Sequence, residues 1–473
     1  MSPRRRLRRR PQDGRAPPAR PSEMTGRPIR ISTITSSEAW VVLATLGVIV
    51  AITVPELGAD PWPFAPPSVH PHGILGPLVR VADREWDLGI IRSTAVLAGL
   101  LVALAAAVTW HVRAWPRWAG ITLTAVVCAM LLVPATLLQV GLRDASEPWY
   151  FTNDSTYQIE IAGDLVLHGH DPYGHDYGSS GLERFYPAAG DEEAAFDRAA
   201  RHHFAYFPGT ALTAAAWRAL PSPLDDYRIF VLLCTLALLP AALLFPGALH
   251  WRLATGAALA ANPILVRGAW FGTADAPALL ALVLAFALFA RGRFVWAAAS
   301  LGAALALKQF ALVAVPFFVV MLLAQRVPRR TLYQAGAAFG GVFLVSVLPF
   351  FVAGPGALWH DTVGYGAATY RIVGYGLAAL LLNLGVIDDR FGYYPFVPLA
   401  LVVWLPITVW LLWNQRRSGV NWAAGLGFAV SMFVLLFLSR VFQTSYLAWP
   451  LTGIGLALLL AEAARISRAP ASA

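Results

Sequence analysis

Long apolar stretches, separated by short polar turns, recur along almost the whole chain and constrain its fold more than any other feature. Of the 473 residues, 57% are hydrophobic and only 13% are charged. A helix needs about 20 apolar residues to cross a bilayer, because hydrocarbon offers its backbone no other hydrogen-bond partners. We therefore predict an all-α, polytopic membrane helix bundle in which the shorter stretches form tilted or broken helices. The apolar stretches lie near residues 40–54, 93–110, 119–141, 228–249, 254–271, 274–290, 294–308, 310–325, 332–352, 395–413, 421–438 and 446–461, about twelve spans.

The positive charge of the chain is concentrated at its N-terminus. The formal net charge is +9, and residues 1–30 contribute +8 of it through ten arginines against Asp13 and Glu23. This Pro- and Arg-rich segment favours disorder. A nucleic-acid-binding tail is one interpretation, but a cytoplasmic tail that fixes topology and touches anionic lipid suits a position before an apolar run. We expect no nucleic-acid partner.

The remaining arginines predict the orientation of the spans. Cytoplasmic turns carry an excess of Arg, and the turns on the side of the N-terminal tail hold Arg113, Arg117, Arg252, Arg291, Arg293, Arg326, Arg329, Arg330, Arg416, Arg417, Arg465 and Arg468. All of these turns fall on the same side of the membrane only if segments 207–221 and 376–387 lie flat or dip into the membrane without crossing it. We therefore predict a multi-pass plasma-membrane protein with a cytoplasmic N-terminus.

The predicted organisation has one large membrane domain. We expect a basic cytoplasmic tail over 1–38, the membrane domain over 39–465 and a short cytoplasmic tail over 466–473. The domain carries extracytoplasmic loops at 142–206 and 353–394.

The first of these loops is strongly acidic. Residues 143–206 hold twelve of the 27 acidic residues of the chain. So polar a segment cannot sit in hydrocarbon, which predicts an aqueous loop or small cap over the bundle. A polar insert of this kind is where a membrane protein with aqueous chemistry does its work.

Asp154 is the first candidate in this loop. If Tyr157 to Leu167 is helical, Asp154 stands near the helix start, where a carboxylate suits the helix dipole. It is then an N-cap. A partly desolvated Asp can equally act as a general base on a hydroxyl group.

A second motif, His168-Gly169-His170-Asp171-Pro172-Tyr173-Gly174-His175-Asp176, resembles a metal site in composition. The interleaved Gly and Pro residues are typical of turns, however, and turns favour Asp and His for local reasons. No His-x-x-x-His spacing is present. A divalent metal is therefore not the favoured interpretation.

Lys308 is the only lysine among the 36 basic residues. It lies between two half-length apolar segments, where a charge needs a partner or an aqueous cavity. It is either an interfacial lysine that extends to water or a ligand for phosphate. Arg267 and Asp275 flank another outer turn, after the proline-broken stretch at Asn262-Pro263, and these two residues could pair with one another.

A polar and aromatic rim marks the outer ends of the last spans, with Arg440, Gln443, Tyr446 and Trp449. An interfacial aromatic belt explains the rings but not Arg440 with Gln443. The sequence contains no G-x-x-x-x-G-K-[ST], no G-x-G-x-x-G after a strand and no G-x-S-x-G motif. Any energy source must therefore arrive with the substrate.

Several short motifs occur in an informative order. They are Asp154 with Tyr157, Gly169 to Tyr173, Tyr206-Phe207-Pro208, Asn262-Pro263, Gly272 to Asp275, Leu307-Lys308 and Tyr446 to Pro450. This order resembles the GT-C superfamily of polyprenyl-phosphate-sugar-dependent glycosyltransferases, and within it glycosyltransferase family eighty-seven, the bacterial mannosyltransferase group. The resemblance covers about residues 140–460. That family usually places its acidic loop after the first span, whereas two additional spans precede it here.

The resemblance implies an inverting transfer of a sugar, with mannose preferred, from a polyprenyl-phosphate donor to an envelope lipid or glycan acceptor. It implies that Asp154 is the catalytic base. It also implies that Lys308, Arg267 and Arg440 neutralise charge on the donor phosphate. The further residues expected to bind substrate are Tyr157, His170, Tyr173, Asp275, Gln443 and Tyr446. No cofactor is expected, since the lipid-linked sugar is itself the substrate.

Two other functions remain open on the sequence. A transporter or glycolipid flippase predicts ionisable residues near span midpoints and a repeated half. A non-catalytic envelope assembly protein would use Asp154 only as a helix cap.

Overall fold

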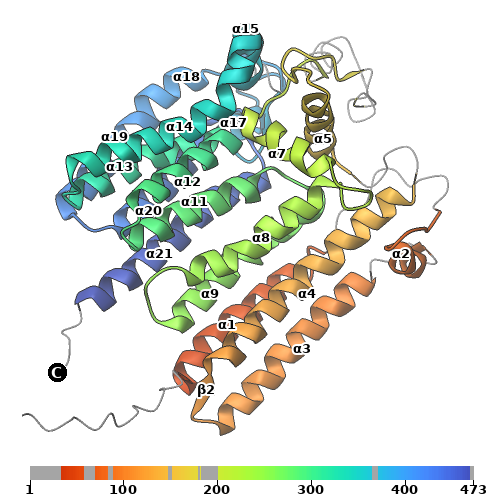
Figure 1. The fold of residues 1–473 in the computed structure, drawn as a ribbon, viewed down its shortest axis with the longest axis vertical. Coiled ribbons are helices and arrows are strands. Elements are labelled where there is room, and N and C mark those ends of the chain that lie inside the picture. The colour runs from red at the N-terminus through yellow and green to blue at the C-terminus, as the bar shows by residue number, and fades with distance from the viewer. Residues whose placement is uncertain are drawn as a thin grey trace, which may run out of the picture. The chain divides into compact units, whose positions relative to one another are not determined.

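The computed structural model describes residues 33–57, 70–83, 89–146, 152–178, 182, 201–364 and 371–468. Within these ranges the chain is helical apart from turns and two small two-stranded sheets (Figure 1). Most of the predicted N-terminal tail and the central part of the acidic loop lie outside the described residues.

Among the described residues, six helical runs are long and apolar enough to cross a membrane. They are α1 (Ser36–Thr53), α3 (Gly89–His111), α4 (Arg117–Asp144), α14 (Arg329–Ala353), the run of α18 (Phe396–Leu399), η5 (Ala400–Trp404) and α19 (Leu405–Ser418), and η6 (Thr444–Leu447) with α21 (Ala448–Arg468). The last helix continues three residues beyond the predicted domain boundary at 465.

Shorter apolar helices fill the rest of the bundle. They are α8 (Tyr227–Leu243), α11 (Asp275–Ala290), α12 (Phe294–Leu307), η3 (Gln309–Val313) with α13 (Ala314–Ala324), and α20 (Trp422–Leu438). With α9 and α10, these runs coincide with all twelve predicted segments. The predicted all-α polytopic bundle is confirmed.

The burial pattern separates inner helices from outer ones. On α14, large apolar side chains such as Val345 and Val352 are 76% and 73% exposed, and they can only be stable against lipid. On α11, by contrast, Leu282 and Phe286 are fully buried, because this helix packs against α8 on one side and α12 on the other. The core of the bundle thus lies around α11.

One predicted span is broken in two, as the proline suggested. The helices α9 (Leu249–Ala260) and α10 (Pro263–Phe271) are separated at Asn262, whose side-chain oxygen caps α10 by accepting a bond from the N–H of Leu265 at 3.1 Å. Proline fits the first turn of α10, because no helical partner exists there for its missing N–H. The break redirects α10 towards the turn that begins α11.

The arginine-rich turns gather at one end of the bundle. Strand β1 (Thr33–Thr35) pairs antiparallel with β2 (Ala114–Pro116), which places the start of α1 beside the turn before α4. Glu462 of α21 accepts a bond from the N–H of Ala248 at 3.0 Å and binds Arg465, so the turn before α9 meets the end of the last helix. These contacts agree with the predicted basic side.

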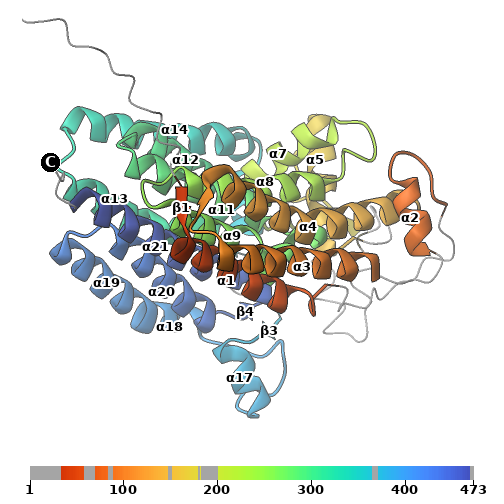
Figure 2. The same cartoon turned by 90° about the horizontal axis from the view of Figure 1, so that it is seen from below.

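The opposite end carries the short helices α5 (Asp154–Leu167), α7 (Pro208–Arg218), α15 (Pro355–Trp359), η4 (His360–Gly364) and α17 (Leu377–Asn383). Figure 1 shows α5, α7 and α15 together at this end. Figure 2 shows α17 beyond the parallel pair of β3 (Val373–Gly374) and β4 (Val441–Phe442). At 1.5 Å per residue α7 is only about 16 Å long, too short to cross a bilayer. A further short helix, α2 (Gly76–Asp83), follows α1.

Candidate functional site

The N-terminus of α5 is fixed to the turn between α10 and α11. The amide of Asn153 and the hydroxyl of Thr156 both donate to the carbonyl of Phe271, and the hydroxyl also lies 3.0 Å from the carbonyl of Gly272. Gly272 has φ 78°, in the left-handed region, and a Cβ there would collide with the Thr156 side chain. The acidic loop is therefore locked onto the membrane bundle at this point.

Asp154 is the first residue of α5 but is not its cap. The cap is Asn153, whose side-chain oxygen accepts a bond from the N–H of Thr156 at 2.9 Å. The interpretation of Asp154 as an N-cap is therefore wrong: the neighbouring amide holds that position. The carboxylate of Asp154 is partly buried and accepts a bond from the N–H of Ser155 at 2.8 Å. Its place in the first turn puts it in the favourable field of the helix dipole.

Tyr206 connects α5 to the rest of the site. Its hydroxyl lies 2.5 Å from the hydroxyl of Ser155, the residue after Asp154. Its carbonyl accepts a bond from the hydroxyl of Tyr173 at 2.8 Å. Burial raises the pKa of Tyr173 well above its ordinary value, so this phenol keeps its proton and remains a donor. Tyr206 is thereby held through its side-chain hydroxyl and through its backbone carbonyl.

Lys308 lies on the other side of Tyr206, just after the end of α12. Its ammonium nitrogen is 2.7 Å from a carboxylate oxygen of Asp275, the first residue of α11. The indole N–H of Trp449 donates to the same oxygen at 2.7 Å. The side chain of Lys308 is 9% exposed and that of Asp275 is 2% exposed, so this is a buried ion pair.

Aromatic rings surround the ammonium group. The nitrogen of Lys308 lies 5.7 Å from the ring centre of Tyr206, 5.4 Å from that of Phe310 and 5.5 Å from that of Tyr446. Rings at these distances attract a cation through their negative faces. They also keep the lysine from reaching bulk water, so the interpretation of Lys308 as an interfacial, extended lysine is wrong.

The pairing of Asp275 also corrects an expectation. Its carboxylate binds Lys308 and Trp449, and not Arg267. Arg267 instead lies with its guanidinium 5.1 Å from the ring centre of Phe271, whose carbonyl holds α5. The second carboxylate oxygen of Asp275 is buried without a hydrogen-bond partner. A buried acceptor of this kind is suited to a hydroxyl or water proton supplied from outside the chain.

The candidate residues of the last spans divide between two tasks. Tyr446 belongs to the group around Lys308, with its ring centre 5.0 Å from that of Phe310. Arg440 donates to the carbonyl of Gly392 at 3.0 Å and so ties the second outer loop to the end of α20. Gln443 is exposed. The structure therefore brings Tyr446 to Lys308, and it gives Arg440 a loop-anchoring bond that its sequence position did not suggest.

The histidines and aspartates of the acidic loop are not arranged as a metal site in the part of the chain that the structure describes. Among the described residues, no three His, Cys, Asp or Glu side chains are arranged to hold a metal ion. Asp171 accepts a bond from the N–H of Tyr173, and Asp176 accepts one from the N–H of Gly178. His170 is exposed. The local turn interpretation describes these residues.

Three residues of this end were missed by sequence reasoning. Asp361 is buried and accepts bonds from the N–H groups of Gly174 at 2.8 Å and Phe204 at 3.0 Å, which folds the acidic loop over η4. Trp449 and Tyr206 were noted as an aromatic belt and as an entry motif, not as contacts of Lys308. Asp361 is the only acidic residue in 353–370, and this isolation was the available signal.

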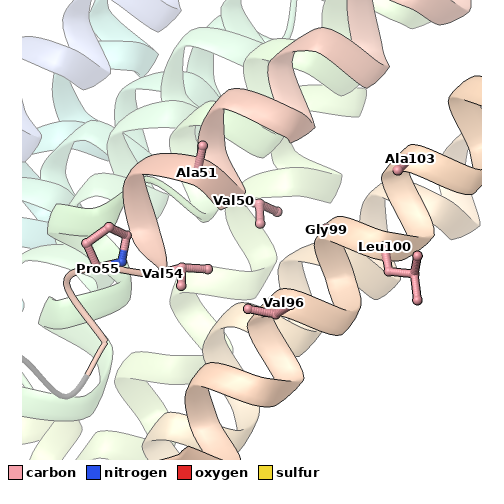
Figure 3. A pocket seen from close by; sticks show the side chains of 8 residues that line it. All are labelled: Val50, Ala51, Val54, Pro55, Val96, Gly99, Leu100 and Ala103. Atoms are coloured by element: carbon pink, nitrogen blue, oxygen red, sulfur yellow. The ribbon is translucent and has the colours of Figure 1, made fainter.

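A separate apolar groove runs between α1 and α3 (Figure 3). Its lining is aliphatic: Val50, Ala51, Val54 and Pro55 from α1 and the turn after it, and Val96, Gly99, Leu100 and Ala103 from α3. Gly99 keeps the two helices close, since a Cβ there would lie 3.2 Å from the side chain of Val50. The groove suits a hydrocarbon chain and is formed by the first two of the three spans that precede the acidic loop.

The fold and the site together define a polytopic membrane protein with a polar centre, held by buried ion pairs, under an extramembrane cap. No protein-family model matches the sequence, and no curated protein is similar to it. The chain is similar in structure to ArnT from Cupriavidus metallidurans, solved with undecaprenyl phosphate bound, with 17% identity and a TM-score of 0.45. The match covers 72% of this chain and 59% of that one, so the chain spans less than two thirds of its neighbour.

Proposed function

We propose that this protein is an inverting glycosyltransferase that moves a sugar from a polyprenyl-phosphate donor to a lipid or glycan acceptor of the cell envelope. Mannose is the preferred sugar, and transfer takes place on the extracytoplasmic face of the plasma membrane. The acidic loop, opposite the arginine-rich turns, supplies the reaction site. The protein needs no cofactor, because the lipid phosphate of the donor is the leaving group.

One observation carries this proposal: the residue next to a partly buried carboxylate and a buried ammonium group both contact the same tyrosine. Asp154 is followed by Ser155, which lies 2.5 Å from the hydroxyl of Tyr206, and the ring of Tyr206 faces Lys308 at 5.7 Å. Glycosyl transfer from a lipid phosphate needs a base for the attacking hydroxyl and a cation for the leaving phosphate. Separate helices, α5 and α12, supply the two groups.

The reaction then follows from the placement of these groups. Asp154 accepts the proton of an acceptor hydroxyl as its oxygen forms a bond to the anomeric carbon of the sugar. The bond from that carbon to the phosphate oxygen breaks on the opposite face, so the configuration inverts. The leaving lipid phosphate gains the electron pair, and Lys308 and Arg267 neutralise its charge. We assign Tyr157, Tyr173, Gln443 and Arg440 to binding and shaping the same region.

Asp275 positions the lysine in this scheme. It uses one of the three N–H donors of the ammonium group, which leaves two directions for phosphate oxygens. The buried oxygen of Asp275 that lacks a partner is then available to a donor hydroxyl. The pair is neutral as a whole, which lowers the cost of burying Lys308 before the substrate arrives.

The transporter alternative finds no support in the described helices. In the six long apolar runs the charged residues lie near the ends, as Arg143 does in α4 and Glu462 in α21. A transporter of ions or charged lipid would be expected to carry such residues near the midpoints of its spans.

The test is sugar transfer from labelled polyprenyl-phosphate mannose in membranes that contain the full-length protein. We expect Asp154→Asn to lose roughly 10²- to 10⁴-fold in rate, the usual contribution of a general base. Asp144→Asn is the matched control, because Asp144 lies at the same end of the bundle and binds the hydroxyl of Ser222 at 2.8 Å. Full activity in Asp154→Asn would show that Asp154 is not the base. If the wild-type protein itself forms no glycosylated product, the proposed function is refuted.

A further inference from the structure

A second polar cavity lies along α5. It has a volume of about 380 Å³, within the range of roughly 300–1,000 Å³ typical of ligand pockets. Tyr157, Ile161 and Leu165 form its floor. These residues are four apart, so they lie above one another on one face of the helix. The cavity is therefore a groove along α5.

The groove begins beside the proposed base. Asp154 precedes Tyr157 by three residues and Ile161 by seven, which places it on the same face of α5 at the N-terminal end. His168, at the other end of this face, also lines the cavity. The face from Asp154 to His168 is roughly 20 Å long at 1.5 Å per residue. A ligand bound in the groove would thus extend towards Asp154.

The polar side chains of the groove are held in place before any ligand binds. Glu160 is 2% exposed and binds Arg143 and the N–H of Tyr227. Asp164 lies 3.0 Å from Arg218, and Arg218 also binds Asp225. Fixed partners of this kind reduce the entropy that binding would otherwise cost.

The rim of the groove is made by histidines. His168 uses its Nδ1 atom, 2.7 Å from the carbonyl of Asp164, and so presents its other nitrogen outward. His170 and His175 line the cavity from the loop that follows α5. Imidazoles, carboxylates and a guanidinium together offer both hydrogen-bond donors and acceptors above an apolar and aromatic floor.

The charges of the groove select between donor and acceptor. Two carboxylates, Glu160 and Asp164, line it, and each is paired with an arginine. The arginine that lines the cavity, Arg218, is already shared by Asp164 and Asp225, so it is not an uncompensated cation for the phosphate of a lipid-linked donor. Asp164, whose side chain is 42% exposed, accepts bonds from neutral hydroxyl groups, and Tyr157 and Leu165 offer surface for the apolar face of a sugar ring. The chemistry of the groove fits an uncharged, hydroxyl-rich ligand.

We propose that the α5 groove binds the glycan of the acceptor and presents one of its hydroxyl groups to Asp154. The proposal rests on the function proposed above and assigns to that function an acceptor site separate from the phosphate site at Lys308. It gives new binding roles to Leu165, His168 and His175. It also predicts that filling the groove affects acceptor binding without affecting the donor.

The test measures binding and turnover separately in the full-length protein. Fluorescently labelled mannotriose is titrated against the wild type, Leu165→Trp and His168→Ala. Leu167→Trp is the matched control, since Leu167 is on the same helix, is 45% exposed and does not line the cavity. Leu165→Trp should weaken binding by about tenfold or more and His168→Ala by a few-fold, while Leu167→Trp binds as the wild type does.

Hydrolysis of labelled polyprenyl-phosphate mannose without acceptor reports the donor site in the same samples. We expect equal hydrolysis by the wild type, Leu165→Trp and His168→Ala. Wild-type binding in both variants, or no binding by the wild type, overturns the acceptor groove. Binding that responds to Leu165→Trp in a protein with no turnover of the donor would leave the groove in place and refute the proposed glycosyl transfer instead.

Discussion

Two buried ion-pair groups lie at the same end of this bundle, and they differ in how completely their oxygens are used. In the first, Arg143, Arg228, Glu160 and Asp226 join α4, α5 and α8, and each of the four carboxylate oxygens accepts at least one hydrogen bond. In the second, Lys308 and Asp275 join α12 and α11, and one carboxylate oxygen has no partner.

The difference separates support from binding. A buried polar group without a partner costs free energy, so a folded chain keeps one only where something offsets that cost. The saturated group has no capacity for a ligand and holds the acidic loop on the bundle. In the unsaturated pair, the ammonium group can donate further hydrogen bonds and one carboxylate oxygen can still accept one. Each prediction below tests this distinction.

The largest effect should follow from breaking the saturated group. Arg143→Met removes the cation between Glu160 and Asp226 and leaves Glu160 buried without its ion-pair partner, while Asp226 keeps Arg228. We expect a loss of about 3–5 kcal/mol in the free energy of unfolding, the usual cost of removing one partner of a buried pair. Denaturant unfolding of the purified protein in detergent measures it.

Arg465→Met is the control for this change. Arg465 binds Glu462 but is largely exposed, and exposed pairs contribute about 1 kcal/mol or less. Equal losses in the two variants would mean that burial does not distinguish them, and the comparison would fail.

The second prediction concerns activity at the unsaturated pair. The double variant Lys308→Met with Asp275→Asn removes both charges, so it leaves no uncompensated ion in the core. We expect stability close to that of the wild type and a loss of roughly 10²- to 10³-fold in sugar transfer, as for removal of a charge-stabilising contact. A folded, fully active double variant would make the pair structural only.

The third prediction compares two indole donors. Trp449→Phe removes the N–H that donates to the charged oxygen of Asp275, while Trp404→Phe removes one that donates to the carbonyl and hydroxyl of Ser431 at 3.0 Å. Hydrogen bonds to charged groups contribute about 1.5–3 kcal/mol and neutral ones about 0.5–1.5 kcal/mol. Trp449→Phe should therefore destabilise the protein more, as thermal unfolding of the pair of variants would show. The reverse order would contradict a charged Asp275.

The spans and their breaks were predictable because they depend on local composition. Long apolar runs without charge form helices in a membrane, and Asn262-Pro263 combines a capping residue with a proline at the first helical position, which together favour a new helix start. The sequence predicts that the helix of the acidic loop begins at Tyr157, and α5 begins three residues earlier, at Asp154. The capping residue was not predictable, since Asn153 and Asp154 are both good caps and only the contact of Asn153 with Phe271 decides between them.

The partners of the charged residues could not be read from the sequence. Arg267 and Asp275 are eight residues apart, yet Asp275 pairs with Lys308, 33 residues further along, because α11 and α12 form an antiparallel pair that brings the start of one to the end of the other. Tyr206 reaches both Ser155 and Lys308 because α7, which begins two residues after it, packs against both α5 and α12. Choice among polar partners is a property of helix packing, and no spacing rule within one segment contains it.

The smallest effect extends the comparison to carboxylates of the loops. Burial raises the pKa of Asp226, but Arg228 and Arg143 outweigh it, so the pKa lies well below its ordinary value of 3.8. Burial also raises the pKa of Asp171. The N–H of Tyr173 opposes this shift and the nearby Asp361 adds to it, and among the described residues no cation offsets it. An acid whose pKa is raised by folding binds its proton more tightly in the native state, so its contribution to stability falls as pH rises through the window above 3.8. An acid whose pKa is lowered has the opposite sign, and Asp226 loses its contribution only as pH falls below 3.8.

Asp171→Asn should therefore flatten a shallow decline in stability on the alkaline side of pH 3.8, while the Asn oxygen still accepts the bond from the N–H of Tyr173. Unfolding midpoints of the wild type and the variant, measured from pH 4 to pH 6, give the difference between the two curves. Curves that stay parallel across this range would show that Asp171 is not desolvated. The contributions of Asp171 and Asp226 to the pH dependence of stability would then not have opposite signs. A difference that grows with pH, in favour of the variant, is the result that a partly buried carboxylate with a raised pKa requires.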